Sequence, residues 1–173
     1  MHLLFLFSIS ILSFYSNICC ANPYFFSKLG AIPQVDAAFN AASKGGTVVA
    51  YKSSESIIIL TYSDYKKDSL INKIRVLSPT LSICYSGITS DGEYLFDKLF
   101  QEVCNNLYAY GTEININRIS KLAGEILHQR TISAFRPLGI KTIIFGIDKN
   151  NNLFLNELDP VGNIYNCKVS CLG

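Results

Sequence analysis

Residues 30–47 read GAIPQVDAAFNAASKGGT, which is the pattern of a helix that leads into a strand. Pro33 suits the first turn of a helix, because its missing N–H would have no partner there. Gly45 and Gly46 end the helix, and the β-branched character of Thr47–Lys52 predicts the first strand. Apolar side chains recur between these limits at helical spacing: Val35, Ala38, Phe39 and Ala42. This stripe is narrow and rich in alanine, so we expect the helix to pack closely against a neighbour.

The composition is that of one apolar domain. The chain has 173 residues, 49% of them hydrophobic and 16% charged, with a formal net charge of +2. This length predicts a single domain, and without a run of basic residues we expect no nucleic-acid partner. No two of the six cysteines have CxxC spacing, so we expect no metal and no cofactor. Cys84 and Cys104 are expected to be buried as small apolar residues.

Residues 1–21 form an apolar leader. The run 3–18 is interrupted by serine and asparagine, and it is too short and too interrupted to predict a membrane span. Small residues at 19–21 suit cleavage by a signal peptidase, although only His2 precedes the apolar run. Two explanations stay open, a secretory signal peptide and a wrongly predicted start of the chain. Disulfide bonds are possible only in the secreted case.

The rest of the chain alternates turn signals with periodic segments. Hairpins are predicted at 47–62 and 74–85, and the apolar run Ile57–Leu60 indicates a strand buried on both faces. Ser90, with Glu93 three residues later, has the spacing of a capping box. The later elements that we expect are helices at 91–110 and 115–133, and strands at 140–148, 153–158 and 164–169.

The order of these elements indicates the fold class. Strands fall in two groups, one before and one after a pair of helices. This order lacks the strand–helix alternation of a parallel doubly wound sheet. Two stacked antiparallel sheets covered by helices satisfy the apolar pattern better. We therefore predict an α+β fold, a four-layer αββα sandwich of two antiparallel sheets flanked by helices.

The opening segment also resembles that of α-type subunits of the 20S proteasome. It shares with that family Phe26-Ser27, Gly30, Gln34-Val35 and Ala38, followed by a Gly-Gly-Thr strand. It departs from the family at three positions: Lys28 replaces Pro, Asp36 replaces Glu and Ala37 replaces Tyr. Later motifs follow in the family's order: Lys73-Ile74, Ser86-Gly87 with Asp91, Arg136-Pro137-Leu138-Gly139, and Asp159-Pro160 with Gly162, Lys168 and Leu172-Gly173. The resemblance runs from about Phe26 to the end.

The resemblance implies a fold and an assembly. It implies the four-layer sandwich in residues 22–173, incomplete at its C-terminus, so that apolar surface is left exposed. It further implies a non-catalytic subunit in a seven-membered α ring that controls substrate access for ubiquitin-dependent protein degradation. The implied partners are other α subunits, the β-subunit ring and the tails of regulatory-particle ATPases, with no membrane for the mature protein. The implied location is cytoplasm and nucleus, or the secretory pathway if the leader is real.

The same resemblance assigns candidate site residues. Lys73 matches the lysine that lines a pocket between subunits and receives the C-terminal carboxylate of an activator tail, a contact that suits a point charge. The helix residues expected at the subunit interface are Gln34, Val35, Asp36, Ala38 and Phe39. The family's gate lies before Phe26, where this chain does not match.

The sequence also admits two other functions. In a catalytic β-type subunit, Thr47 would become the N-terminal residue and the nucleophile, its free amine would act as base, and Lys73 would tune it. Against this, Thr47 and Lys73 are 26 residues apart (73 − 47), which is shorter than in catalytic subunits, and Ser63 stands where those subunits carry Asp. The other function is a secreted β-rich binding domain with a real leader and oxidised Cys167 or Cys171.

Overall fold

The computed structural model describes residues 26–62, 73–133 and 135–173. The leader and Ser63 lie outside this range. In chain order the elements are α2 (Pro33–Ser43), β1 (Val48–Lys52), β2 (Ile57–Thr61), β3 (Ile74–Ser78), β4 (Leu81–Gly87), α3 (Thr89–Tyr110), α4 (Ile116–Ile132), β5 (Ile140–Ile147), β6 (Leu153–Leu158), β7 (Ile164–Asn166) and β8 (Val169–Leu172). Within the described ranges, no helix is both long and apolar enough to cross a membrane.

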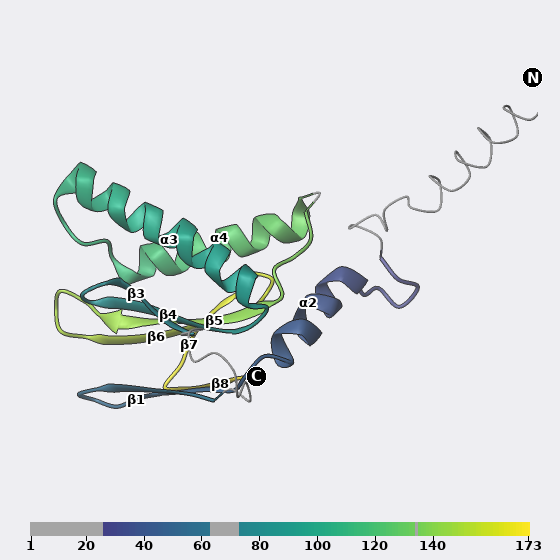
Figure 1. Cartoon of the computed structure of the whole chain (residues 1–173), viewed down its shortest axis with the longest axis horizontal. Coiled ribbons are helices and arrows are strands. Elements are labelled where there is room, and N and C mark those ends of the chain that lie inside the picture. The colour runs from purple at the N-terminus through teal and green to yellow at the C-terminus, as the bar shows by residue number, and fades with distance from the viewer. Residues whose placement is uncertain (1–25, 63–72, 134) are drawn as a thin grey trace, which may run out of the picture.

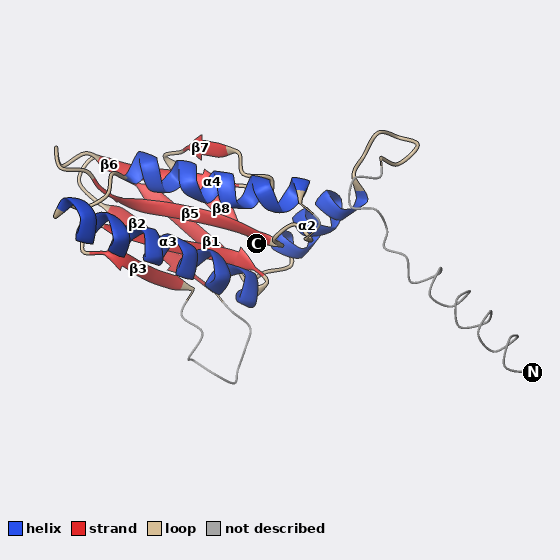
Figure 2. Ribbon diagram, turned by 90° about the horizontal axis from the view of Figure 1, so that it is seen from above, coloured by secondary structure: helices blue, strands red, loops and turns tan. Residues whose placement is uncertain are grey.

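Two antiparallel sheets stack on each other, as the sequence predicted. One has three strands in the order β2-β1-β8, and the other has five in the order β3-β4-β5-β6-β7. Helices α3 and α4 cover the outer face of the five-stranded sheet, and α2 packs at one end of the sandwich (Figure 1; Figure 2). The α+β class is confirmed, and three of the four expected layers lie in the described part of the chain.

The central strands of the five-stranded sheet are apolar on both faces. On β4, Ile83 packs beneath the helices, whereas Cys84 packs between the sheets. On β5, Ile144 packs beneath the helices and Ile143 packs between the sheets. Successive side chains of a strand point to opposite faces, so a strand that is covered twice needs a continuous apolar run. This double coverage explains why β4 contains the apolar run Ile83–Tyr85 and β5 contains the apolar run Ile143–Phe145.

The last predicted strand is two strands in different sheets. Residues 164–169 were predicted as one element, but β7 pairs with β6 and β8 pairs with β1. The chain crosses between the sheets at Cys167 and Lys168, where Cys167 N–H donates to the Leu155 carbonyl and the Lys168 carbonyl accepts from Lys52 N–H. A switch of sheets leaves no mark in a pattern of alternating residues, so the sequence did not reveal it.

The outer face of the three-stranded sheet is apolar and exposed. Two rows cross it, Leu60–Val49–Cys171 and Ile58–Tyr51–Val169. Ile58 is 51% exposed and Leu60 is 64% exposed, so the prediction that Ile57–Leu60 is buried on both faces was wrong. In the described ranges no helix covers this face, which agrees with the expectation of exposed apolar surface.

Two predictions about α3 were also wrong. The helix begins at Thr89 after Ile88, and no side chain caps it. Glu93 does not complete a capping box, because its carboxylate accepts from Arg75 Nη1 at 2.6 Å and from the Tyr85 hydroxyl at 2.5 Å. Cys104 is exposed on this helix, whereas Cys84 is fully buried as predicted.

The next helix begins as the sequence indicated. The Asn115 side chain caps α4 by accepting from the Asn117 N–H at 2.8 Å. Asparagine is among the residues preferred at this position, because its side chain satisfies a helix N–H that has no partner in the helix itself.

Helix α2 packs unusually close to the sheet, as its alanine stripe predicted. Ala42 is fully buried and Ala38 is 6% exposed, against β4 and β5. A β-carbon added at Gly87 would lie 3.1 Å from the α-carbon of Ala42, and Gly87 has a positive φ of 121°. There is no space here for a larger side chain on either element.

We expect Ala42→Leu to lower the free energy of unfolding by about 1–3 kcal/mol, the usual cost of overpacking a filled interior. The matched control is Ala37→Leu on the exposed side of the same helix, where we expect little change. Urea denaturation followed by circular dichroism measures both variants. Equal effects of the two substitutions would contradict the close packing of α2.

Candidate functional site

One end of the sandwich gathers several of the predicted site residues. Here α2 ends, β1 begins, and Lys73 lies immediately before β3. The Ser86 hydroxyl of β4 donates to the Gly46 carbonyl at 3.0 Å and ties the connection between α2 and β1 to the five-stranded sheet. A β-carbon at Gly45 would overlap Gly87 N and Ser86 Oγ, so the backbone can approach this closely only without a side chain.

The Lys73 ammonium lies against Gly46, not against Thr47. A β-carbon added at Gly46 would overlap Lys73 Nζ and would lie 2.6 Å from the Tyr62 carbonyl oxygen. The lysine is half-buried, and its amine fills the space that a side chain at position 46 would occupy. The residue beside the lysine therefore has no side chain to activate.

Thr47 itself is exposed. Val48, the next residue, is fully buried, and adjacent residues of an extended chain point to opposite faces. Thr47 thus faces outward, whereas the Lys73 amine lies on the side of Gly46. A nucleophile needs its activating group within hydrogen-bond reach. The structure does not bring Thr47 and Lys73 into that arrangement.

Lys73 also faces a buried thiol. Cys84 is fully buried between the sheets, and β3 places Ile74 opposite it. Burial raises the pKa of the Cys84 thiol to about 11, while the nearby Lys73 charge and a backbone hydrogen bond lower it less. Reactive cysteines need a lowered pKa and solvent access. Cys84 has neither, and its role is to pack.

The α2 residues predicted at a subunit interface divide into two groups. Ala38 is buried against β4 and β5 of this chain. Gln34, Val35 and Phe39 are half-buried, and Asp36 is exposed. Gln34 lines a pocket of about 350 Å³ with Arg136 and Gly139, and its Oε1 is buried without a hydrogen-bond partner in the described ranges.

Asp91 and Arg136 form a pair to which the sequence motifs assigned no role. The two carboxylate oxygens of Asp91 each accept from Arg136 at 2.7 Å, and Oδ2 also accepts from Gly139 N–H at 2.9 Å. Asp91 is buried, while the Arg136 side chain is 59% exposed. The hydrogen bond to Asp91 raises the pKa of the guanidinium. The opposite charges of Asp91 and Arg136 were the available signal in the sequence, but nothing in their spacing showed that the two side chains meet.

A second carboxylate organises the turn after β6. Asp159 accepts from Val161 N–H at 3.0 Å, from Asn163 N–H at 2.9 Å and from Asn163 Nδ2 at 2.8 Å. Gly162 packs closely against Gly124 of α4. A β-carbon added at Gly124 would lie 2.7 Å from the carbonyl oxygen of Gly162. The Asp-Pro-Val-Gly sequence is therefore a helix-packing turn, not a site of chemistry.

The described residues contain no cluster of three or more His, Cys, Asp or Glu side chains that could hold a metal ion. The cysteines described, Cys84, Cys104, Cys167 and Cys171, are free thiols. Burial and the nearby Glu157 charge raise the pKa of Cys167.

Residues 42–173 match the family model described as "Proteasome subunit". The chain belongs to the proteasome subunit family. This match covers every strand and helix described except most of α2, and it includes the Gly46–Lys73 contact and the Asp91–Arg136 pair.

Among curated proteins, this proteasome-family chain is similar to α subunits of archaea and eukaryotes. It is 29% identical over 142 residues to a proteasome subunit alpha of Sulfurisphaera tokodaii, covering 79% of this chain and 59% of the relative. It is 27% identical over 158 residues to proteasome subunit alpha type-2 of Saccharomyces cerevisiae, covering 86% and 62%. A 30% match to a proteasome subunit alpha of Metallosphaera sedula covers 76% and 58%. The chain thus spans about 60% of the length of these relatives.

The buried thiol gives the proteasome-family domain an alkaline instability. The folded chain keeps the proton of Cys84 up to about pH 11, whereas an ordinary thiol loses it near pH 9. Between these values unfolding releases a proton, so rising pH favours the unfolded chain. The favourable effect of the protonated Cys84 thiol on the free energy of unfolding is fully present below about pH 9, and it is lost as the pH rises toward 11.

We expect the free energy of unfolding to fall over this window, with about 2 kcal/mol of the fall due to Cys84. Urea titrations at several pH values measure it. Cys84→Ala should show a shallower fall, although it is less stable at neutral pH because of the cavity. The Tyr85 hydroxyl, whose pKa is also raised by burial and by Glu93, contributes in both proteins, and slightly less in the variant because the Cys84 charge adds to that rise. If the free energy of unfolding falls equally with pH in the wild type and in the variant, the prediction is contradicted.

Proposed function

We propose that this chain is a non-catalytic α-type subunit of the 20S proteasome core. It would take one place in the seven-membered outer ring that controls substrate access to the β ring, in ubiquitin-dependent protein degradation. The proposed location is the cytoplasm and nucleus. The matched relatives named above are all called alpha subunits, and that name supports the α type over the catalytic β type.

One observation carries the proposal: the Lys73 ammonium occupies the side-chain space of Gly46. In a threonine protease of this fold, a threonine would have to stand next to that amine. Here the neighbour is glycine and Thr47 points outward. This geometry favours a structural role and disfavours the alternative in which Thr47 is the nucleophile.

Lys73 suits the binding of a carboxylate. It is half-buried at the end of the sandwich, where a single positive charge can meet the C-terminal carboxylate of a regulatory ATPase tail. The outward surface of α2, with Gln34, Val35, Asp36 and Phe39, supplies the neighbouring contact. The buried Gln34 Oε1, which has no hydrogen-bond partner among the described residues, fits a surface that another subunit completes.

The assembly prediction is tested on the protein in its native cells. We expect the chain to copurify with other α subunits and with β subunits, in a particle far larger than its own 19.2 kDa. Native mass spectrometry of an affinity-tagged chain measures particle mass and composition. In the purified particle, Lys73→Ala should weaken binding of a peptide with a free C-terminal carboxylate, whereas Lys44→Ala, an exposed lysine at the end of α2, should not. A monomer in a secretory fraction would contradict the proposal.

A further prediction concerns Thr47. We expect the mature chain to retain the residues before Thr47, because α2 is a packed part of the fold. We also expect no covalent adduct with an epoxyketone that targets N-terminal threonines. N-terminal sequencing and intact-mass spectrometry measure both, and Thr47→Ala should leave the peptidase activity of the particle unchanged. A mature chain that begins at Thr47 and forms the adduct would establish the protease alternative.

A further inference from the structure

The other end of the sandwich holds a pocket that none of the functions above uses. Its volume is about 630 Å³. It lies between the β1–β2 turn, the β3–β4 turn, the β5–β6 turn and the α3–α4 connection. Strand β4 runs from the pocket at Leu81 to the α2 contact at Gly87, so the pocket is at the end opposite Lys73.

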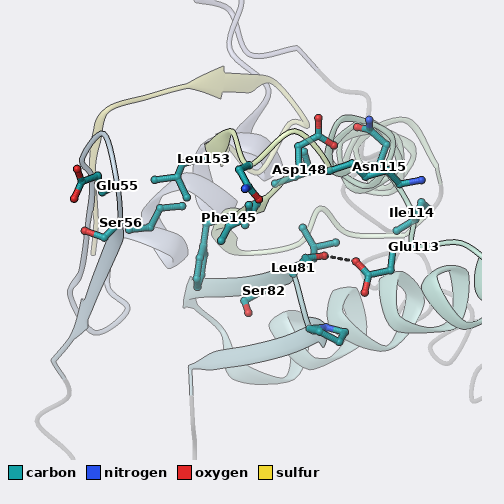
Figure 3. Close-up of a pocket in the computed structure, with 18 residues that line it drawn as sticks. Glu55, Ser56, Leu81, Ser82, Glu113, Ile114, Asn115, Phe145, Asp148 and Leu153 are labelled. Atoms are coloured by element: carbon teal, nitrogen blue, oxygen red, sulfur yellow. Dashed lines mark hydrogen bonds between the residues drawn. The ribbon is translucent and has the colours of Figure 1, made fainter.

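The floor of this pocket is apolar. Ile57, Phe145 and Leu153 line it, and the first two also pack against the apolar layer between the sheets. The floor is therefore the uncovered end of that layer. In Figure 3, Leu153 and Phe145 lie between the β1–β2 turn on one side and the α3–α4 connection on the other. Pockets of this size with an apolar lining and a few polar groups are typical of binding sites.

The rim is acidic, in contrast to the chain as a whole. Three carboxylates line the pocket, Glu55, Glu113 and Asp148, against one ammonium, Lys149. The formal charge of the lining is therefore −2, whereas that of the chain is +2. Glu113 is already engaged, because one of its oxygens accepts from the Thr80 hydroxyl at 2.5 Å. Glu55 and Asp148 stand on opposite sides of the apolar floor (Figure 3).

We propose that this pocket binds a segment of another protein that inserts an apolar side chain onto Ile57, Phe145 and Leu153 and places lysine or arginine residues beside Glu55 and Asp148. The sign of the rim charge selects a basic segment, and the floor selects an apolar residue within it. The inference rests on the proposed function only in taking the occupant to be another protein subunit.

The test uses the full chain and three capped tetrapeptides. The probe is Ac-Lys-Leu-Phe-Lys-NH2, and its controls are Ac-Glu-Leu-Phe-Glu-NH2 and Ac-Lys-Ser-Ser-Lys-NH2. Isothermal titration calorimetry gives affinity, and amide chemical shifts locate the bound peptide. We expect the probe to bind at least tenfold more tightly than either control and to shift the amides of the pocket lining. We also expect its affinity to fall as salt rises.

Variants separate the floor from the rim. Ser56→Trp should block the pocket and reduce affinity at least tenfold, whereas Ser54→Trp, in the same turn but outside the pocket, should not. The double variant Glu55→Gln, Asp148→Asn should weaken the probe about threefold to tenfold, as expected for two partly exposed charge pairs. It should also remove the preference over the glutamate peptide. Asp97→Asn, an exposed carboxylate outside the pocket, is the control.

Several results would overturn the inference. The first two are equal affinity for the lysine and glutamate peptides and no binding of the lysine probe at millimolar concentration. The other two are equal losses of affinity for Ser54→Trp and Ser56→Trp, and amide chemical-shift changes confined to the exposed face of the three-stranded sheet. Dimerisation that Ser56→Trp abolishes would identify a second copy as the occupant. Each result is independent of particle membership, because the peptides are tested on the isolated chain. A chain found in no proteasome particle would refute the proposed function and leave the pocket measurement intact.

Discussion

The burial of both faces of the five-stranded sheet is the constraint on which the rest of the structure depends. Side chains of β4 and β5 alternate between the helices and the second sheet, as Ile83 and Cys84 do. A sheet with two apolar faces must be covered twice, here by α3 and α4 on one side and by the three-stranded sheet on the other. Buried apolar surface is the main favourable term in folding, so this double coverage fixes the order of the layers.

This stacking gives the domain two different ends. At one end α2 closes the space between the sheets, with Ala42 and Gly87 nearly in backbone contact. At the other end turns surround an opening that exposes the end of the inter-sheet layer, with Phe145 on its floor. The closed end carries a cationic lysine, and the open end carries an acidic rim. A domain built in this way can present opposite charges to partners on its two ends.

The contact between Lys73 and Gly46 follows from backbone geometry. Close approach of the α2–β1 connection to β4 requires Gly45, and the adjoining Gly46 leaves the space that the Lys73 ammonium fills. The residue that lies against the lysine amine is therefore Gly46, which carries no hydroxyl. Farther from this end, Asp91 links the start of α3 to the loop before β5 through Arg136 and Gly139. These polar contacts hold elements in place, since buried polar groups are stable only when they are paired.

The sequence by itself determined the fold class, both hairpins and the burial of Ala42, because each depends on local periodicity or on the conformational preference of a residue. Only the tertiary structure decided which face of the Ile57–Leu60 strand is covered, that residues 164–172 divide between two sheets, and that Glu93 binds Arg75 and Tyr85. It also placed Lys73 beside Gly46. These features depend on contacts between residues far apart in the sequence, and local periodicity carries no information about which distant segments meet.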